Sequence, residues 1–362
     1  MIAAMVIAAI ACAGPPLPAH GGTVMLPAQE WEFAPGPRAV KVYAFYPRGA
    51  IEYVTSSTGL MLCLHNWGGT GHDGAPDPVQ VADRYDVIAI SVDYVQSGKW
   101  DTRAGVPYDF GYVQALDALR ALRYVFASLD DAKRPFARGR IYATGGSGGG
   151  NVALMANKLA PRTFACVVDI SGMTKLTDDI AFGMPGGSDL NAGYSRDPQS
   201  KAYLTPDARA LRFVGNPEHL KTMRALGNAA TVVVVHGADD PVCPADDARE
   251  TVAEFERAGI DVKSHFIDAG DLDNDALTDT QHSLGDRTTI LFKFADEFLR
   301  PGSSNLRVRQ APTDFERRDE HVRYRSENGE YVVSYKDGHP AGAFVHTTGG
   351  VTPHESFPNP KP

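Results

Sequence analysis

A serine enclosed by glycines, between a strand-like run and a helix-like run, constrains the fold of this chain most. Ser147 is the centre of Gly145-Gly146-Ser147-Gly148-Gly149, which follows the apolar run at 141–144 and precedes a helix-forming run at 151–156. A strand that turns sharply into a helix needs glycines, because a β-carbon would clash at the crowded corner. Such a corner strains the serine backbone, lifts its hydroxyl above a sheet and leaves the next amide free. The alternatives are a phosphate-binding loop and an ordinary tight turn.

The composition fits one large folded domain with a small addition. The 362 residues are 43% hydrophobic, which is enough to bury a substantial core. The formal net charge is -9 and no run of lysine or arginine offsets it, so nucleic acid is not an expected partner. The four cysteines are Cys12, Cys63, Cys166 and Cys243. They show no Cys-x-x-Cys spacing, so we expect neither a disulfide framework nor a metal or redox pair, and no cofactor.

The N-terminus resembles a leader for export. The first eleven residues are apolar and end at Ala11-Cys12-Ala13, a small-residue pattern that signal peptidase recognises before Gly14. We interpret residues 1–22 as a signal peptide and leader, which predicts a periplasmic or secreted protein. A lipid anchor on Cys12 is one alternative, and a cytoplasmic protein is expected if the leader is not functional. No later stretch is long and apolar enough to span a bilayer, so no integral membrane span is expected.

Strand-like and helix-like segments alternate along residues 23–300. Near-continuous apolar runs, typical of strands covered on both faces, occupy residues 60–64 and 87–92, and we expect further strands at 140–144, 165–170, 231–235 and 262–266. Helical patterns occupy residues 109–129, 151–159, 246–258 and 288–299. This order predicts an α/β fold with a doubly wound, mostly parallel sheet. We expect an antiparallel hairpin to open it, with strands at 39–46 and 51–54.

Two regions depart from this alternation. Residues 172–228 are rich in glycine, proline and polar residues, with short helical patterns at 206–211 and 217–226, and predict a lid or substrate-side insertion. Flexible surface padding is the alternative. Residues 301–351 contain a hairpin pattern around Asn328-Gly329 and predict a small β appendage. The proline-rich residues 352–362 are expected to form a loose tail.

A reactive serine needs further side chains from later in the chain. Its hydroxyl requires a general base at neutral pH, and an imidazole base requires a carboxylate to hold its tautomer. Asp239 and Asp240 follow the run at 231–235, and sites of open sheets form at such strand ends. His282 lies on the loop before the final helix, whereas its competitor His265 falls inside a strand. We predict His282 as the base and Asp240 as the acid, with Asp239 as the alternate.

The order and content of these motifs resemble the α/β-hydrolase superfamily. The stretch at 236–244 is similar to the His-Gly-x-x-Asp-x-x-Val-Pro sequence of the dienelactone-hydrolase and prolyl-oligopeptidase-like branches, with Cys243 where valine is usual. His65-Asn66-Trp67-Gly68-Gly69-Thr70-Gly71 resembles the oxyanion loop of the superfamily, with Asn66 in place of the first glycine. The resemblance runs from Val40 to Leu299 and implies a triad of Ser147, Asp240 and His282. It also implies that the amides of Trp67 and Gly148 form an oxyanion hole; the alternative is that these glycines only let the chain turn.

These motifs together predict a serine hydrolase that cleaves an ester through an acyl-enzyme. A peptidase of the prolyl-oligopeptidase-like type and a non-catalytic binding protein on the same scaffold are the alternatives. We prefer an ester because the chain contains no large N-terminal propeller like that which gates peptide entry in the oligopeptidase branch. The expected partner is a small-molecule or oligomeric ester or amide substrate. Candidate substrate-binding residues on loops at the expected sheet edge are His65, Tyr94, Trp100 and Tyr108, for which simple packing is the alternative.

An acidic loop at 271–279 precedes His282. Asp271, Asp273, Asp275 and Asp279 have a spacing reminiscent of a calcium loop. Ala276 stands in place of the required glycine, however, and His282 stands where a bidentate glutamate would close the site. We therefore expect a solvated acidic loop beside the base and no metal site.

Overall fold

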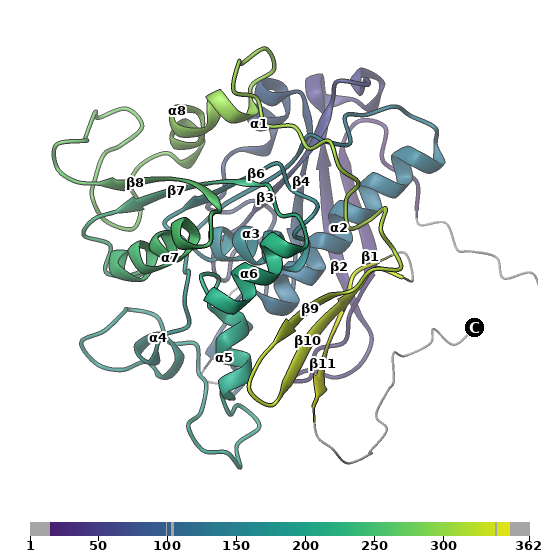
Figure 1. The fold of residues 1–362 in the computed structure, drawn as a ribbon. Helices are drawn as coiled ribbons and strands as arrows, with labels where there is room; N and C mark the ends of the chain where they lie inside the picture. Colours follow the sequence, from purple (N-terminus) through teal and green to yellow (C-terminus); the bar gives the residue numbers. More distant parts are fainter. Residues whose placement is uncertain (1–14, 99, 103–104, 337–338, 348–362) are drawn as a thin grey trace, which may run out of the picture.

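A computed structural model describes residues 15–98, 100–102, 105–336 and 339–347 of the chain (Figure 1). Residues 1–14, on which most of the predicted leader falls, and the predicted tail at 352–362 lie outside the described residues. Within the described part, no helix combines the length and the apolar character needed to cross a membrane.

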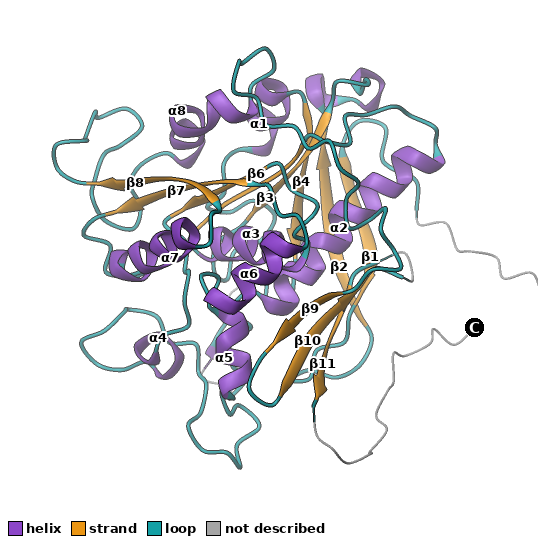
Figure 2. Cartoon of the chain, in the orientation of Figure 1, coloured by secondary structure: helices purple, strands orange, loops and turns teal. Residues whose placement is uncertain are grey.

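An eight-stranded sheet lies at the centre of the fold, in the order β1-β2-β4-β3-β5-β6-β7-β8 (Figure 2). Six of the predicted strands form its parallel part: β3 (Gly59–Leu64), β4 (Val87–Asp93), β5 (Ile141–Gly146), β6 (Cys166–Ile170), β7 (Thr231–Gly237) and β8 (Asp261–Ile267). Strands β3, β5, β6 and β7 are buried along their whole length, because helices cover both faces. The predicted doubly wound α/β architecture is confirmed.

The helices divide into two layers, one on each face of the sheet. One core cluster contains residues of α2 (Tyr112–Asp131), α3 (Gly148–Leu159) and α7 (Ala245–Arg257). The other contains residues of α1 (Pro78–Tyr85) and α8 (Arg287–Leu299). Asp77 caps α1 and Asp286 caps α8, because each side chain accepts a hydrogen bond from a free amide of the first turn. The cap at Asp286 fixes the end of the loop that carries His282.

The predicted opening hairpin is wrong. Strand β2 (Arg38–Phe45) forms, but it pairs antiparallel with β1 (Gly22–Ala28) and with β4. Pro47–Gly49 and Ile51–Tyr53 form two short 3₁₀ helices instead of a second strand. Arg48 has a φ of 54°, which turns the chain away from the sheet, and the Ile51 amide donates to the Ala19 carbonyl. The β-forming residues Ile51–Tyr53 therefore lie in a 3₁₀ helix instead of a strand.

A second, three-stranded antiparallel sheet lies against the insertion (Figure 1). The insertion contains α4 (Asp178–Phe182), α5 (Pro206–Arg212) and α6 (Pro217–Ala225), and the sheet contains β9 (Val322–Arg325), β10 (Gly329–Ser334) and β11 (Ala341–His346). The Asp207 carboxylate on α5 accepts hydrogen bonds from the amide and the Nδ2 of Asn328, at 2.9 and 3.0 Å. His219 Nε2 on α6 lies 3.0 Å from the Arg325 carbonyl. These contacts tie the C-terminal sheet to the insertion.

Replacing Asp207 with alanine is expected to lower the free energy of unfolding by about 1–3 kcal/mol, because two donors of Asn328 lose their acceptor. Urea denaturation measures the change. Lys221→Ala is the matched control on α6, since its ion pair with Glu218 is exposed and is worth less than about 1 kcal/mol. Equal losses in the two variants would show that the contact between sheet and insertion carries no stability of its own.

Candidate active site

Ser147 lies at the corner where β5 ends and α3 begins. Its φ of 55° and ψ of -122° are unusual for a residue with a side chain. A β-carbon on Gly145 would lie 2.3 Å from the Gly149 carbonyl carbon, and one on Gly149 would lie 2.0 Å from the Leu64 carbonyl oxygen. The glycines therefore allow the close approach of three backbone segments that holds Ser147 in this conformation.

Three side chains from separate loops form a continuous series of hydrogen bonds at the carboxyl edge of the sheet. His282 Nε2 lies 2.9 Å from Ser147 Oγ, and His282 Nδ1 lies 2.8 Å from Asp240 Oδ2. The Asp240 side chain is fully buried, whereas that of His282 is 21% exposed. This geometry allows the imidazole to take the hydroxyl proton while the carboxylate holds the opposite ring nitrogen.

The structure distinguishes Asp240 from its alternate, Asp239. Asp240 Oδ1 accepts hydrogen bonds from the amides of Val242 and Cys243 at 2.8 and 2.9 Å, which fixes the carboxylate toward His282. Asp239 is exposed, and its carboxylate accepts a hydrogen bond from the Thr280 hydroxyl at 2.7 Å. Only Asp240 therefore contacts the imidazole of His282.

A second histidine, which the sequence analysis did not single out, supports Asp240. His236 Nε2 lies 2.7 Å from the Cys243 carbonyl and 3.4 Å from Asp240 Oδ2. Burial lowers the pKa of His236, so we infer a neutral ring that donates from Nε2. The sequence signal that could have identified His236 was its position in the His-Gly pair at the end of β7.

His265, the competitor of His282, packs its ring against Phe294 with centroids 4.5 Å apart and takes no part in the series of hydrogen bonds.

The Trp67 amide lies close to Gly148, the residue that follows Ser147. A β-carbon on Gly148 would lie 2.7 Å from the Trp67 amide nitrogen. Gly148 is the first residue of α3, so its amide has no partner within the helix. The loop that carries Trp67 is held by a hydrogen bond from the Asn66 amide to the Asp73 carbonyl, at 2.9 Å. Two donors beside a hydroxyl are the arrangement that stabilises a developing oxyanion.

Replacing Gly148 with alanine is expected to lower kcat by about 10²- to 10³-fold, the loss caused by removing one oxyanion donor, because the added methyl group displaces the Trp67 amide. Steady-state hydrolysis of a p-nitrophenyl ester measures it. Gly270→Ala is the control, since the nearest atom to its added carbon is the end of a side chain, 3.1 Å away. An unchanged kcat in the Gly148 variant would argue against this oxyanion hole.

Two of the predicted substrate-binding residues are core residues. His65 and Tyr94 are buried with their rings stacked 3.9 Å apart, and the Tyr94 hydroxyl donates to the His65 carbonyl. His65 Nδ1 lies 2.7 Å from the Asn66 carbonyl, and Nε2 lies 2.7 Å from Ser97 Oγ. With every ring nitrogen of His65 engaged inside the protein, these side chains support the Trp67 loop instead of contacting substrate. The sequence did not reveal this burial, because both residues follow predicted strands and were therefore placed on loops.

The other two candidates belong to an apolar cluster at the site. Tyr108 is buried, and its ring stacks on Trp67 with centroids 3.5 Å apart; Trp100 is half-buried. The cluster also contains Cys243 and, from the insertion, Met173, Leu176, Ile180, Phe182 and Leu190. The partly exposed members are Trp67, Trp100, Phe182, Leu190, Ala208 and Val242. The loop of Trp67 and the insertion therefore meet in apolar contacts beside Ser147 and His282.

Comparison with known proteins agrees with this architecture. This chain belongs to the family described as protein of unknown function DUF2920. The family model matches residues 102–339, a range that includes Ser147, Asp240, His282 and part of the C-terminal sheet. No curated protein matches the sequence.

Solved structures of peptidases share the fold of this DUF2920 member. A puromycin-hydrolyzing peptidase of Mycobacterium tuberculosis is 18% identical, with a TM-score of 0.50 over 76% of this chain and 38% of that chain. An acylaminoacyl peptidase in complex with a chloromethyl ketone is 16% identical, with a TM-score of 0.52 over 78% and 42%. The acylaminoacyl peptidase of Pyrococcus horikoshii is 14% identical, with a TM-score of 0.51 over 78% and 42%. This chain thus spans less than half of each structure, and the shared part has the α/β-hydrolase fold.

Two ionisable side chains, the buried Asp169 and the half-buried Arg287, lie close to the serine corner. A β-carbon on Gly146 would meet the Arg287 guanidinium at 2.3 Å, and one on Gly150 would meet Asp169 Oδ1 at 2.0 Å. Burial raises the pKa of Asp169 to about 7, and the Asp240 charge adds to this, whereas the Gly172 amide and Arg287 oppose it. Arg287 donates to the Gly74 carbonyl, so it links the loop of His282 to the oxyanion loop.

The raised pKa of Asp169 predicts a pH-dependent stability. Its contribution is fully present below the ordinary pKa of 3.8 and is lost as the pH rises through about 7, because the folded state holds the proton more tightly. Asp169→Asn removes this loss. The difference in unfolding free energy between the variant and the parent protein should therefore shift in favour of the variant by about 2–3 kcal/mol between pH 5 and pH 8, measured by urea denaturation. A difference that does not change with pH would contradict this assignment.

The acidic loop before His282 uses its carboxylates for turns and an ion pair. Asp273 accepts from the amides of Asp275 and Leu277 and lies 2.6 Å from Lys293 Nζ. Asp279 accepts hydrogen bonds from the amides of Gln281 and Leu284. These contacts shape the loop that delivers His282 to the site.

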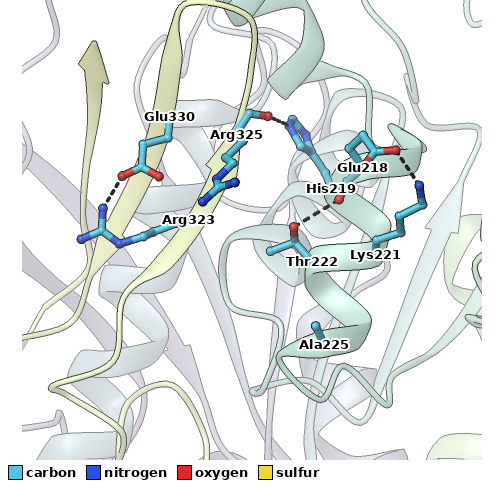
Figure 3. A pocket seen from close by; sticks show the side chains of 8 residues that line it. All are labelled: Glu218, His219, Lys221, Thr222, Ala225, Arg323, Arg325 and Glu330. Atoms are coloured by element: carbon cyan, nitrogen blue, oxygen red, sulfur yellow. Dashed lines mark hydrogen bonds and ion pairs between the residues drawn. The ribbon is translucent and has the colours of Figure 1, made fainter. Parts of the chain in front are cut away.

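A surface hollow of about 460 Å³ lies between α6 and the strands β9 and β10 (Figure 3). It is lined by Glu218, His219, Lys221, Thr222, Ala225, Arg323, Arg325 and Glu330. Lys221 pairs with Glu218, and Arg323 pairs with Glu330, so most of its charges are neutralised (Figure 3). None of the triad or oxyanion residues lines this hollow, and we assign it no part in the chemistry.

Proposed function

We propose that this protein is a serine hydrolase that cleaves esters through an acyl-enzyme. The observation that carries the proposal is the unbroken series of hydrogen bonds from Ser147 through His282 to Asp240, with the Trp67 amide close to Gly148. A strained serine, a base within hydrogen-bond reach and a buried carboxylate are the parts that nucleophilic catalysis requires.

The proposed reaction has two halves. Ser147 Oγ attacks the carbonyl carbon while His282 Nε2 takes its proton, and the amides of Trp67 and Gly148 hold the resulting oxyanion. The imidazolium then returns the proton to the leaving alcohol, which departs and leaves the acyl group on Ser147. Water then attacks the carbonyl carbon of the acyl group while His282 takes its proton. The imidazolium returns that proton to Ser147 Oγ, and the acid is released. The 21% exposure of His282 gives water access to the ring.

We further propose that the substrate carries an apolar group. The support is the set of partly exposed apolar side chains around the triad, with Trp67 from the oxyanion loop, Val242 from the loop of Asp240, and Phe182 and Leu190 from the insertion. Each buried methylene contributes about 0.8 kcal/mol, so a chain of a few carbons gains substantially from such surroundings.

A peptidase is the second candidate, and the observation that favours it is the set of peptidases with the same fold. A panel of p-nitrophenyl esters and matching p-nitroanilides, with acylated dipeptides, separates the two. For an esterase we expect kcat/KM above about 10⁴ M⁻¹s⁻¹ on the best ester and no amide cleavage above the level of the Ser147→Ala variant. Cleavage of an acylated dipeptide at a rate comparable with that of the ester would replace the esterase assignment with a peptidase.

A further inference from the structure

A cysteine thiol lies inside the triad. Among the residues that the structure describes, Asp240, Cys243 and His282 are the one group of three potential metal ligands whose donor atoms all lie within 4.8 Å of one another. Cys243 is three residues after Asp240, and its amide hydrogen bond to Asp240 Oδ1 turns the loop back toward the site. There its thiol lies near the Ser147 hydroxyl. A valine, the usual residue of the resembled motif, would offer no such donor.

We propose that Asp240, Cys243 and His282 form a binding site for a thiophilic divalent cation such as Zn²⁺, and that this cation inhibits the enzyme. The inhibition rests on the proposed function, but the binding does not. Zinc takes thiolate, imidazole and carboxylate ligands at about 2.0–2.3 Å, so its ligand atoms stand about 3–4 Å apart. The donor atoms lie within 4.8 Å of one another, so the side chains would have to rotate to reach these values. The thiolate selects against Ca²⁺ and Mg²⁺, which take oxygen ligands.

The charges around the thiol favour a cation. Asp240 places negative charge near Cys243, and the positive charge of Arg287 acts against it. The thiol proton leaves to solvent as the metal–sulfur bond forms, since the thiolate is the ligand. The entry route is the His282 side of the group, because that side chain is 21% exposed while the Asp240 side chain is buried.

Binding would stop catalysis through the base. A cation on a ring nitrogen of His282 uses the electron pair that otherwise accepts a proton, and one on Asp240 removes the carboxylate that stabilises the imidazolium. This proposal departs from the expectation that the chain has no metal site. Asp240 and Cys243 lie three residues apart, whereas His282 comes from a distant loop, so no local spacing in the sequence indicates that the three side chains are close together.

The test uses Ser147→Ala protein, which needs no turnover for its readout. Titration with Co²⁺, a spectroscopic substitute for Zn²⁺, is expected to give a thiolate-to-cobalt charge-transfer band at one equivalent, and Zn²⁺ is expected to remove it. In the same background, Cys243→Val should abolish the band and weaken Zn²⁺ binding by calorimetry about 10- to 100-fold or more. The matched control is Cys166→Val, which replaces another buried thiol outside the group and should change neither. Circular dichroism verifies that each variant is folded.

The outcomes separate the two proposals. Absence of the band, or equal Zn²⁺ affinity with and without Cys243, overturns the metal site. A band that depends on Cys243 in a protein that hydrolyses none of the substrates supports the site and removes the inhibitory role together with the proposed function. In an active protein, the Zn²⁺ concentration for half inhibition should rise about 10-fold or more in Cys243→Val and stay unchanged in Cys166→Val.

Discussion

Ser147→Ala is expected to lower kcat for p-nitrophenyl esters by about 10⁴- to 10⁶-fold. The variant keeps the amides of Trp67 and Gly148 and the apolar cluster, but it lacks the only hydroxyl within hydrogen-bond distance of His282 Nε2 among the described residues. Without that oxygen no acyl-enzyme forms. The residual rate reflects attack by water that is aided by the oxyanion donors alone.

The control for this variant is Ser57→Ala. Ser57 is exposed and precedes β3, so it lies at the opposite edge of the sheet from the triad. Its kcat should stay within about threefold of the parent value, since surface substitutions away from a site usually change little. Equal activity of Ser147→Ala and the parent protein, in preparations free of contaminating esterase, would remove Ser147 from the mechanism.

Asp240→Asn is expected to lower kcat by about 10⁴-fold with little change in KM. An amide in place of Asp240 keeps the shape of the side chain and an acceptor for the Val242 and Cys243 amides. Its NH₂ group, however, faces His282 Nδ1, so the ring holds the wrong tautomer and its positive form loses its counter-charge. The loss should appear in pre-steady-state acylation as well as in steady-state turnover.

Asp239→Asn is the matched control for this change. The two aspartates are adjacent, but the Asp239 carboxylate is exposed and accepts from the Thr280 hydroxyl, which an amide oxygen also allows. We expect kcat within about threefold of the parent protein. A large loss in Asp239→Asn with an active Asp240→Asn would transfer the role of the acid to Asp239.

The parallel strands and the serine corner were predictable because their signals are local. An apolar run such as 231–235 indicates a strand covered on both faces wherever it occurs, and glycines around one serine suit one kind of turn. The acid and the base could be placed because each follows a strand, and the carboxyl ends of parallel strands meet at one edge. The structure brings Ser147, Asp240 and His282 together there.

The features that sequence reasoning missed depend on contacts between distant segments. Strand β1 pairs with β2 through backbone groups, and the side chains of β1 do not indicate which strand it pairs with. His65 and Tyr94 have polar atoms that suit a substrate site equally well, and only the packing of the fold shows that they are buried. The position of Cys243 beside Ser147 likewise follows from the turn that its amide makes with Asp240.

The C-terminal sheet is the part whose role was least visible in the sequence. It lies against α5 and α6, and the family match extends through residue 339. The insertion that packs on the sheet also contributes Met173, Leu176 and Ile180 to the apolar cluster at the site. The sheet therefore supports, through the insertion, one wall of the proposed active site.

The most direct measurement of the central claim is the mass of the protein after reaction with a fluorophosphonate. This reagent reacts with a serine only where a base activates the hydroxyl and nearby donors stabilise the negative oxygen. We predict the addition of a single phosphonyl group per chain, mapped by peptide mass spectrometry to Ser147 and absent from Ser147→Ala and His282→Ala. An unmodified, folded protein that binds a ligand without reacting, or a label on another serine, would contradict the account.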